Sequence, residues 1–333
     1  MAPLRIAIAG FRHAHILDLY RRVSNDPRVE LVALCEENFA ASLLPVNGIA
    51  ATHTSFESLL REVDCDVIAL GDSYGRRGAQ AIRALTAGKH VLADKPLCTR
   101  SEEWDAIRAL ATRDGPRIGM MLDLRDLGNM IALRESVLRG RIGSVQSVVL
   151  AGLHPLLYGT RPAWYFEPGM HGGTLCDIGT HVMDFLPWLT GFDIAAVEYA
   201  RTWNAKAAAT PGFEDCAQFV MRLENGAGVI GDVSYLAPEA CGYTLLNYWK
   251  ITIHGTRGFA ETSFTSPGVT IADDDADAPL ILPPSASRPG GWLEDFLADV
   301  EGAPRPHGLD TDRVLTAMRW ALDLQSHADH RLP

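Results

Sequence analysis

The sequence lacks the long apolar runs and paired cysteines that mark membrane-spanning and disulfide-rich chains. No stretch reaches the roughly 20 unbroken apolar residues that a transmembrane helix needs. The first apolar run ends at Gly10, too early for the apolar core of a secretory signal peptide. The 6 cysteines are scattered and form no C-x-x-C pair. We therefore expect reduced thiols in the cytoplasm, with neither a disulfide framework nor a structural zinc site.

Basic side chains are also few relative to acidic ones. The chain has 30 Lys and Arg against 41 Asp and Glu, a net charge of −11. Because nucleic-acid binding relies on clustered Lys and Arg, this balance argues against DNA or RNA as a partner. The composition is that of a globular protein, with 47% hydrophobic and 21% charged residues. A length of 333 residues exceeds one ordinary core and predicts two domains.

The first third of the chain alternates short apolar runs with amphipathic stretches. Its apolar runs are Leu4–Ala9, Val29–Cys35, Val67–Leu70, Val91–Ala93 and Ile118–Leu122. Runs that are apolar on both faces and bounded by turn residues are typical of strands buried in a parallel sheet. Helices are expected at Gly75–Thr86 and at Ser101–Thr112, the second with Ser101 as its N-cap. This alternation predicts an α/β fold, with a doubly wound parallel sheet over residues 1–122.

The remainder, residues 123–333, has a different pattern and is expected to bind substrate and mediate oligomerisation. After a helix around Asn129–Leu138, strands are expected at Val145–Leu150, Ala195–Thr202, Ala217–Leu223, Gly228–Tyr235, Leu245–His254 and Phe259–Thr262. Several alternate apolar and polar residues, which predicts an open, mainly antiparallel sheet. Ser266–Pro289 is expected to be a surface loop, followed by helices at Trp292–Glu301 and Thr311–His327.

The turn after the first strand is the first candidate site. Leu4–His15 places Gly10 between a buried strand and a helix, where backbone amides can hold a pyrophosphate. Of the glycines in the G-x-G-x-x-G fingerprint only Gly10 is present, because Arg12 and His15 replace the others. Arg12 would crowd the phosphate or contact it through its guanidinium. An ordinary strand-to-helix turn explains the segment equally well.

Two charged residues follow later strands of this domain. Glu36 lies at the tip of the second strand, where a carboxylate can accept hydrogen bonds from the adenosine ribose and repel a 2′-phosphate. No Lys or Arg follows it closely, so NAD is favoured over NADP; the alternative is a solvated acid at a strand end. Lys95 follows the strand ending at Ala93, at the carboxyl edge where sites in doubly wound folds occur.

A third cluster lies in Gly172–Trp188. If this segment is helical, Asp177 and His181 share a face at a spacing of i, i+4, and Asp184 follows His181 at i+3. A carboxylate beside an imidazole can orient it and raise its pKa, as a general base requires. Two alternatives remain open: Thr174-x-x-Asp177 is an N-terminal capping arrangement, and His181 is a satisfied core histidine.

These motifs together resemble the Gfo/Idh/MocA oxidoreductase family. The segment from Ala87 to Leu97 is similar to the family's AGKHV-x-x-EKP motif, and the segment from Gly172 to Asp184 to GG-x-x-x-D-x-G-x-H-x-x-D. Arg125 and the run from Arg139 to Gly143 add to the likeness. The resemblance covers nearly the whole chain. It implies a Rossmann domain followed by an α/β domain with an open sheet.

The resemblance also implies roles for single residues. Lys95, Asp177 and His181 would be catalytic. Residues expected at the cofactor are Gly10, Phe11, Arg12, His13, His15, Glu36, Asp72, Ser73, Asp94, Lys95 and Pro96. Residues expected at the substrate, besides the catalytic three, are Arg125, His154, Tyr158 and Trp164, with Tyr165 and Asn247 as further candidates. No metal is expected. The chain departs from the family at Asp72-Ser73, where the family has Thr-Pro, and at Asp94, where it has Glu.

The expected reaction is NAD-dependent oxidation of a secondary alcohol of a sugar, cyclitol or related polyol. His181 would take the hydroxyl proton, Lys95 would stabilise the alkoxide, and Asp177 would orient His181 or bind a neighbouring hydroxyl. Two other functions remain open: an enzyme that retains NAD while cleaving a glycoside, and a non-enzymatic NAD-binding sensor. An open sheet with an exposed apolar face also predicts a homodimer or homotetramer.

Overall fold

The computed structural model describes residues 2–112 and 114–329, which form two compact units. Unit 1 takes in the first 121 residues together with Pro162–Gly172 and Trp292–Arg319. Unit 2 takes in Leu122–Arg161, Gly173–Gly291 and the chain from Trp320 onward. The first break lies after residue 121, next to the boundary predicted after residue 122. Two later segments, however, belong to the first unit.

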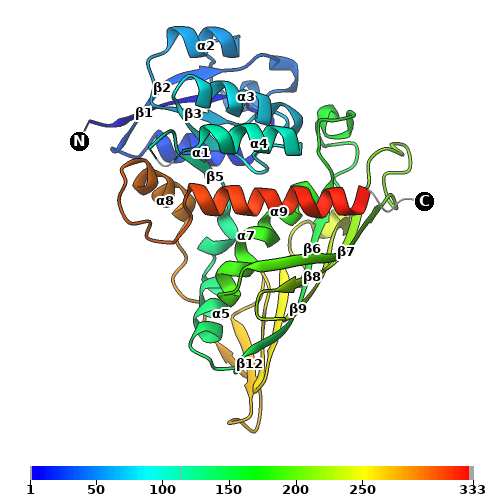
Figure 1. The fold of residues 1–333 in the computed structure, drawn as a ribbon. Coiled ribbons are helices and arrows are strands. Elements are labelled where there is room, and N and C mark those ends of the chain that lie inside the picture. The colour runs from blue at the N-terminus through cyan, green and yellow to red at the C-terminus, as the bar shows by residue number, and fades with distance from the viewer. Residues whose placement is uncertain (1, 113, 330–333) are drawn as a thin grey trace. The chain divides into compact units, whose positions relative to one another are not determined.

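Unit 1 is built on a five-stranded parallel sheet in the order β2-β1-β3-β4-β5 (Figure 1). Its strands are β1 (Leu4–Ala9), β2 (Val29–Cys35), β3 (Val67–Leu70), β4 (His90–Ala93) and β5 (Ile118–Met120). The helices between them are α1 (His15–Val23), α2 (Phe56–Glu62), α3 (Tyr74–Thr86) and α4 (Ser101–Leu110), with 3₁₀ turns at Phe39–Ala41 and Pro45–Asn47. The predicted doubly wound sheet is therefore confirmed. Ser101 is the first residue of α4 rather than its N-cap, which is Arg100.

The late segments complete the core of unit 1. They contribute helix α8 (Gly291–Val300), the first part of helix α9 (Thr311–Asp329) and a 3₁₀ turn at Ala163–Phe166. The indole nitrogen of Trp104 on α4 donates to the carbonyl of Leu315 at 2.9 Å. A Cβ added to Gly119 would come within 2.6 Å of the Phe296 ring, so α8 packs directly on β5.

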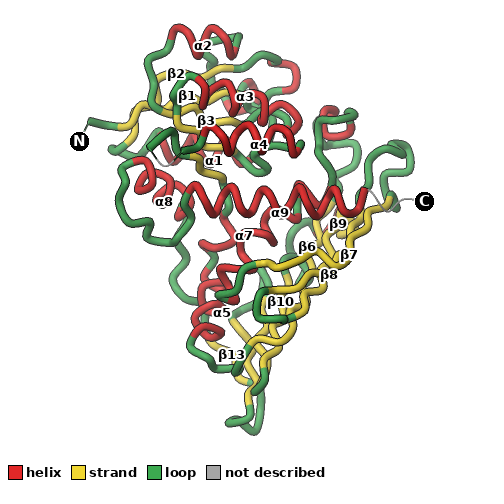
Figure 2. The backbone as a smooth tube through the Cα atoms, viewed as in Figure 1, coloured by secondary structure: helices red, strands yellow, loops and turns green. Residues whose placement is uncertain are grey.

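Unit 2 is built on an eight-stranded sheet in the order β13-β12-β11-β10-β6-β9-β8-β7 (Figure 2). Its strands are β6 (Val145–Pro155), β7 (Ile194–Trp203), β8 (Cys216–Leu223), β9 (Gly228–Ala237), β10 (Lys250–Gly255), β11 (Gly258–Thr262), β12 (Val269–Asp273) and β13 (Leu280–Leu282). Neighbours pair antiparallel except β6 and β9, which are parallel. Buried and exposed residues alternate along β8, as expected for a sheet with one covered face. The mainly antiparallel sheet is confirmed.

The helices of unit 2 lie before, between and after its strands in the chain. They are α5 (Gly128–Leu138), α6 (Thr174–Asp177), α7 (Gly179–Thr190) and the later part of α9, with 3₁₀ turns at Asp123–Asp126 and Glu239–Cys241. The prediction of a loop over Ser266–Pro289 is wrong, because β12 and β13 lie within it as the last strands of the sheet. The strand expected from Leu245 begins only at Lys250.

Two further observations bear on the expected class of protein. Within residues 2–112 and 114–329, no helix combines the length and apolar character needed to cross a membrane. All six cysteines are free thiols, and five of them are buried. Burial, together with the nearby acidic residues, raises the pKa of Cys35 to about 12, which keeps this thiol protonated at neutral pH.

Candidate active site

The turn between β1 and α1 lies against the ends of two neighbouring strands. The amide of Gly10 donates to the carbonyl of Cys35, and the amide of Arg12 donates to that of Gly71, both at 2.9 Å. Gly10 has φ +82°, and a Cβ there would lie 2.5 Å from the backbone nitrogen of Asp72. Only glycine fits this close approach. The turn thus lies at the carboxyl end of β1, between the ends of β2 and β3. Doubly wound folds bind nucleotides at this edge of the sheet.

Glu36 is fully buried beside this turn and is satisfied by the chain's own donors. One carboxylate oxygen accepts from the guanidinium of Arg12, with Nη2 at 2.7 Å, and from the amide of Asn38 at 2.8 Å. The other accepts from the amide of Phe11 at 2.9 Å. Burial alone would raise the pKa of Glu36, but these hydrogen bonds hold it below the ordinary value. The carboxylate, which was expected to bind the ribose, is 0% exposed.

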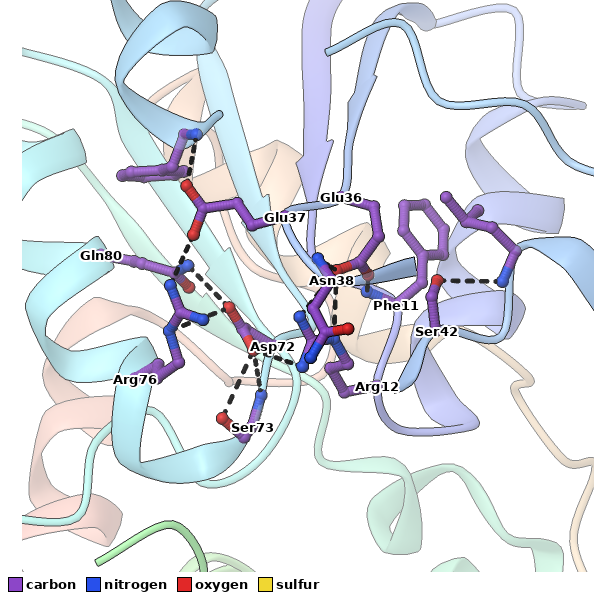
Figure 3. Close-up of polar contacts among 12 residues, drawn as sticks. Phe11, Arg12, Glu36, Glu37, Asn38, Ser42, Asp72, Ser73, Arg76 and Gln80 are labelled. Carbon is purple, nitrogen blue, oxygen red and sulfur yellow. Dashed lines mark hydrogen bonds and ion pairs between the residues drawn. The ribbon is translucent and has the colours of Figure 1, made fainter. Parts of the chain in front are cut away.

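A second group of charges surrounds Asp72, at the end of β3 (Figure 3). Asp72 is buried and accepts from the amide of Ser73 at 2.7 Å and from the side-chain amide of Gln80 at 3.0 Å. Arg76, from the first turn of α3, lies 3.5 Å from Asp72 and pairs with Glu37. Two guanidinium groups, Arg12 and Arg76, therefore face three carboxylates, which leaves the network with a net charge of −1.

The imidazoles of His13 and His15 both contact the carboxylate of Asp94, the residue after β4. Their Nδ1 atoms lie 2.8 and 3.1 Å from the Asp94 carboxylate, which is fully buried and also paired with Arg77. Burial would raise the pKa of Asp94, but Arg77 and the two histidines hold it well below its usual value. Burial lowers the pKa of His13 to about 4, against the opposing effect of Asp94. His13 is therefore neutral at pH 7, with its Nδ1 proton directed at Asp94.

These three side chains are close enough together to hold a metal ion. The surrounding charge argues against one. The guanidinium of Arg77 donates to Asp94 at 3.0 Å and neutralises the only carboxylate of the cluster. Lys95 follows directly in the chain, so a divalent cation would meet two existing positive charges. The cluster is better suited to fixing the orientation of the two imidazoles.

Lys95 lies on a loop that Arg77 holds in place. Arg77 is fully buried and donates to the carbonyls of Asp94 at 2.9 Å, Lys95 at 2.6 Å and Pro96 at 3.2 Å. The Lys95–Pro96 peptide is cis. The Lys95 side chain is 6% exposed, and its ammonium lies 5.8 Å from the centre of the Tyr74 ring. The sequence thus predicted the position of Lys95 but missed its support, because Arg77 is 18 residues away in the chain.

Tyr74 packs against three other aromatic residues of unit 1. The ring of Tyr74 is 5.0 Å from that of Trp164, 5.8 Å from Tyr165 and 5.7 Å from His171, measured between centroids. The carbonyl of Met170 accepts from the amide of Gly75 at 2.8 Å. Trp164, expected at the substrate, is 4% exposed and packs within this group.

Unit 2 holds the other expected catalytic residues. Asp177, at the end of α6, accepts a hydrogen bond from the hydroxyl of Tyr235 on β9, and both side chains are buried. His181, in the first turn of α7, is 5% exposed; its Nδ1 lies 4.0 Å from a carboxylate oxygen of Asp123. Its ring contacts Trp249 at 5.5 Å. A tyrosine from the sheet is thus among the partners of Asp177.

The remaining residues expected at the substrate fall into two groups. Arg125 is buried and donates to Asp184 at 2.8 Å, so its charge is balanced inside unit 2. His154 lies among four aromatic rings at centroid distances from 5.0 to 6.4 Å: Tyr235, Tyr243, Tyr248 and Trp249. Tyr158 is exposed, with its hydroxyl 3.3 Å from that of Thr210, and Asn247 is exposed as well. This aromatic surround was not predicted, because its rings come from β9 and the loop before β10, far from His154 in the chain.

Comparison with protein families identifies the chain. Residues 4–121 match the model described as "Oxidoreductase family, NAD-binding Rossmann fold", and residues 130–261 match the "GFO/IDH/MocA C-terminal domain". The chain belongs to the GFO/IDH/MocA oxidoreductase family. Both halves of the fold and the resemblance read from the sequence motifs are thereby confirmed.

Similar proteins of this family are named as sugar and cyclitol enzymes. The 1,5-anhydro-D-fructose reductase of Ensifer adhaerens is 29% identical, over 83% of this chain and 80% of that protein. Inositol 2-dehydrogenase 2 of Saccharopolyspora erythraea is 27% identical, over 69% of this chain and 64% of that protein. The crystal structure of an inositol dehydrogenase homologue from Azotobacter vinelandii, complexed with NAD⁺, has a TM-score of 0.79 at 20% identity. The superposition covers 99% of this chain and 96% of the homologue, and it shows that the two proteins share a fold.

The turn in this GFO/IDH/MocA protein fits a dinucleotide even though only its first glycine is kept. Gly10 provides the left-handed turn, and α1 begins without a side-chain cap on its first amides. Arg12 is paired with Glu36, so its charge is already balanced. Sequence reasoning missed the ion pairs of Glu37 and Arg76 beside this turn. The signals for them were the second glutamate after β2 and the departure from the family pattern at Asp72-Ser73.

Proposed function

We propose that the protein transfers hydride between NAD and a secondary alcohol of a sugar, cyclitol or related polyol. The observation that carries this proposal is the buried Lys95, held by Arg77 on the loop after β4 of an NAD-binding Rossmann unit. The names of the relatives favour a polyhydroxylated substrate, since they include an anhydrofructose reductase and an inositol dehydrogenase.

Lys95, Asp177 and His181 are the proposed catalytic residues. NAD held at the Gly10 turn would supply the hydride acceptor for oxidation of the alcohol carbon to a carbonyl. His181 takes the hydroxyl proton, and the Lys95 ammonium stabilises the negative charge that grows on the oxygen. Asp177 binds a neighbouring hydroxyl or helps to orient the imidazole. Because Tyr235 donates to Asp177, the carboxylate is fixed in place before substrate arrives.

The test is NADH formation with a panel of polyols, using wild-type protein and two variants. Lys95→Met and His181→Ala are each expected to lower turnover by about two to four orders of magnitude. Glu102→Gln, at an exposed residue in the first turn of α4, is the matched control and keeps wild-type turnover. Thermal unfolding of all variants checks that the fold is intact. Wild-type turnover in a folded Lys95→Met protein contradicts the assignment.

A non-enzymatic NAD sensor is the alternative of a different class. It is favoured by the loss of two phosphate-loop glycines and disfavoured by the buried, supported lysine, which a sensor does not need. The same polyol panel separates the two, because a sensor binds NAD without forming NADH. An enzyme that retains NAD would instead consume a glycoside with no net NADH.

We also infer that the protein works as a homo-oligomer in the cytoplasm. The sheet of unit 2 carries exposed apolar side chains on several strands: Val149, Tyr199, Val220, Ile230 and Ile281. A second copy of the chain would cover such a face. The six free thiols suit a reducing compartment.

A further inference from the structure

We propose that Glu37 and Arg76, rather than Glu36, select the cofactor at its adenosine ribose, an inference that rests on the proposed NAD-dependent function. Two consecutive glutamates follow β2, and the structure uses them differently. The Glu36 side chain is 0% exposed and bound to Arg12, whereas the Glu37 side chain is 28% exposed. The residue that keeps a carboxylate available at this strand end is therefore Glu37.

Glu37 is held in a defined position. One of its carboxylate oxygens accepts from the amide of Phe56, the first residue of α2, at 2.9 Å. The other pairs with the Arg76 guanidinium (Figure 3). Each oxygen keeps a lone pair for a further donor. The pair thus offers an acceptor for two vicinal hydroxyl groups and, in Arg76, a donor for a hydroxyl oxygen.

The position of this pair is that of an adenosine subsite. It lies at the carboxyl ends of β2 and β3, on the two strands that flank β1 and the Gly10 turn. Doubly wound folds bind the ribose at the end of the second strand. The carboxylate of Glu36, which occupies the usual ribose-binding position, is bound to the Arg12 guanidinium. We therefore assign ribose binding to the next residue, Glu37.

Charge then decides between the two nucleotides. Arg12, Arg76, Glu36, Glu37 and Asp72 together carry a net charge of −1. A 2′-phosphate, which adds up to two negative charges, is repelled by this network, whereas the 2′-hydroxyl of NAD donates to it. Removing the charge of Glu37 brings the sum to zero and leaves Arg76, whose side chain is 42% exposed, to bind a phosphate. Arg76 could thus bind a 2′-phosphate, and its ion pair with Glu37 prevents this.

The experiment is a calorimetric titration of the full-length protein with NAD and with NADP. Wild-type protein is expected to prefer NAD. Glu37→Gln should weaken NAD binding about tenfold, the value of one hydrogen bond to a charged group. It should strengthen NADP binding about tenfold by removing the repulsion. Glu37→Gln combined with Arg76→Gln should lose the gain for NADP, while the control Glu102→Gln keeps the wild-type ratio of the two dissociation constants.

The outcomes separate this inference from the function on which it rests. If the wild type binds NAD but Glu37→Gln leaves the ratio unchanged, the cofactor-selecting role of Glu37 is refuted and the oxidoreductase proposal stands. If Glu36→Gln shifts the ratio and Glu37→Gln does not, the role returns to Glu36. If the wild type binds neither nucleotide, the proposed function itself fails, and this inference with it.

Discussion

Replacing Arg12 by Met should destabilise unit 1 strongly, because it removes the partner of a carboxylate that has no access to water. Arg12 and Glu36 are 4% and 0% exposed, with the closest contact at 2.7 Å. Breaking a buried ion pair on one side typically costs about 3–5 kcal/mol. For a folding unit of this size, that cost lowers the midpoint of thermal unfolding by roughly 6–20 °C.

The assay is thermal and urea unfolding of the single variants and of Arg12→Met combined with Glu36→Met. Because apolar replacement of both partners is often nearly neutral, the double variant should recover most of the lost stability. Arg22→Met is the matched control, since it breaks an ion pair with Asp18 that is about one-third exposed. Such surface pairs contribute about 0–1 kcal/mol.

The pH dependence of this pair has a definite sign. Because the pKa of Glu36 is lowered in the folded state, the contribution of the pair is complete at neutral pH. It is lost as the pH falls through that lowered value. A loss in Arg12→Met no larger than in Arg22→Met, or a double variant no more stable than the single one, would refute the reasoning.

Three further predictions concern other parts of the chain. Because the pKa of His13 is lowered to about 4, the free energy of unfolding should fall as the pH drops from 6.5 towards 4, where the unfolded chain binds a proton that the folded chain does not. Urea unfolding of His13→Gln across this window should show a smaller fall in that free energy. A fall equal to that of the wild type contradicts the prediction. Tyr235→Phe should destabilise unit 2 by about 1–3 kcal/mol, because buried Asp177 loses its donor, and should shift the acid limb of the turnover–pH profile. A Tyr235→Phe protein with wild-type unfolding and pH profile would deny Tyr235 that role. Ile230→Glu, which places a charge on a side chain 55% exposed on the apolar sheet face, should lower the mass measured by light scattering to that of one chain; an unchanged oligomer would place the interface elsewhere.

The fold of unit 1 could be predicted because its signals are local. The strands β1, β2 and β3 begin and end where the apolar runs do, since a strand buried on both faces is apolar along most of its length. The strands β12 and β13 gave no such signal. They are five and three residues long, lie at the last positions of the sheet and are separated by acidic residues, so they read as loop.

The candidate site was predictable residue by residue but not in its pairings. Spacing along a helix predicted that Asp177 orients His181, but it did not predict the tyrosine 58 residues away that donates to Asp177. In the same way, nothing in the sequence shows that the Arg12 guanidinium donates to Glu36. Such partners depend on how separate segments pack, and single-sequence patterns carry no information about that.

The late segments of unit 1 have a consequence for folding during synthesis. Thr311 bonds through its hydroxyl to the amide of Ile118 on β5, a partner made 193 residues earlier. At about 5–20 residues per second, a ribosome needs roughly 10–40 s to make that intervening chain. For most of this interval β5 lacks α8, and Trp104 lacks the carbonyl of Leu315 that accepts its indole proton. The nucleotide-binding unit thus begins to leave the ribosome first, but its core is completed only near the end of synthesis. Chaperones that shield apolar surface should therefore associate with the nascent chain until α8 and α9 have been made.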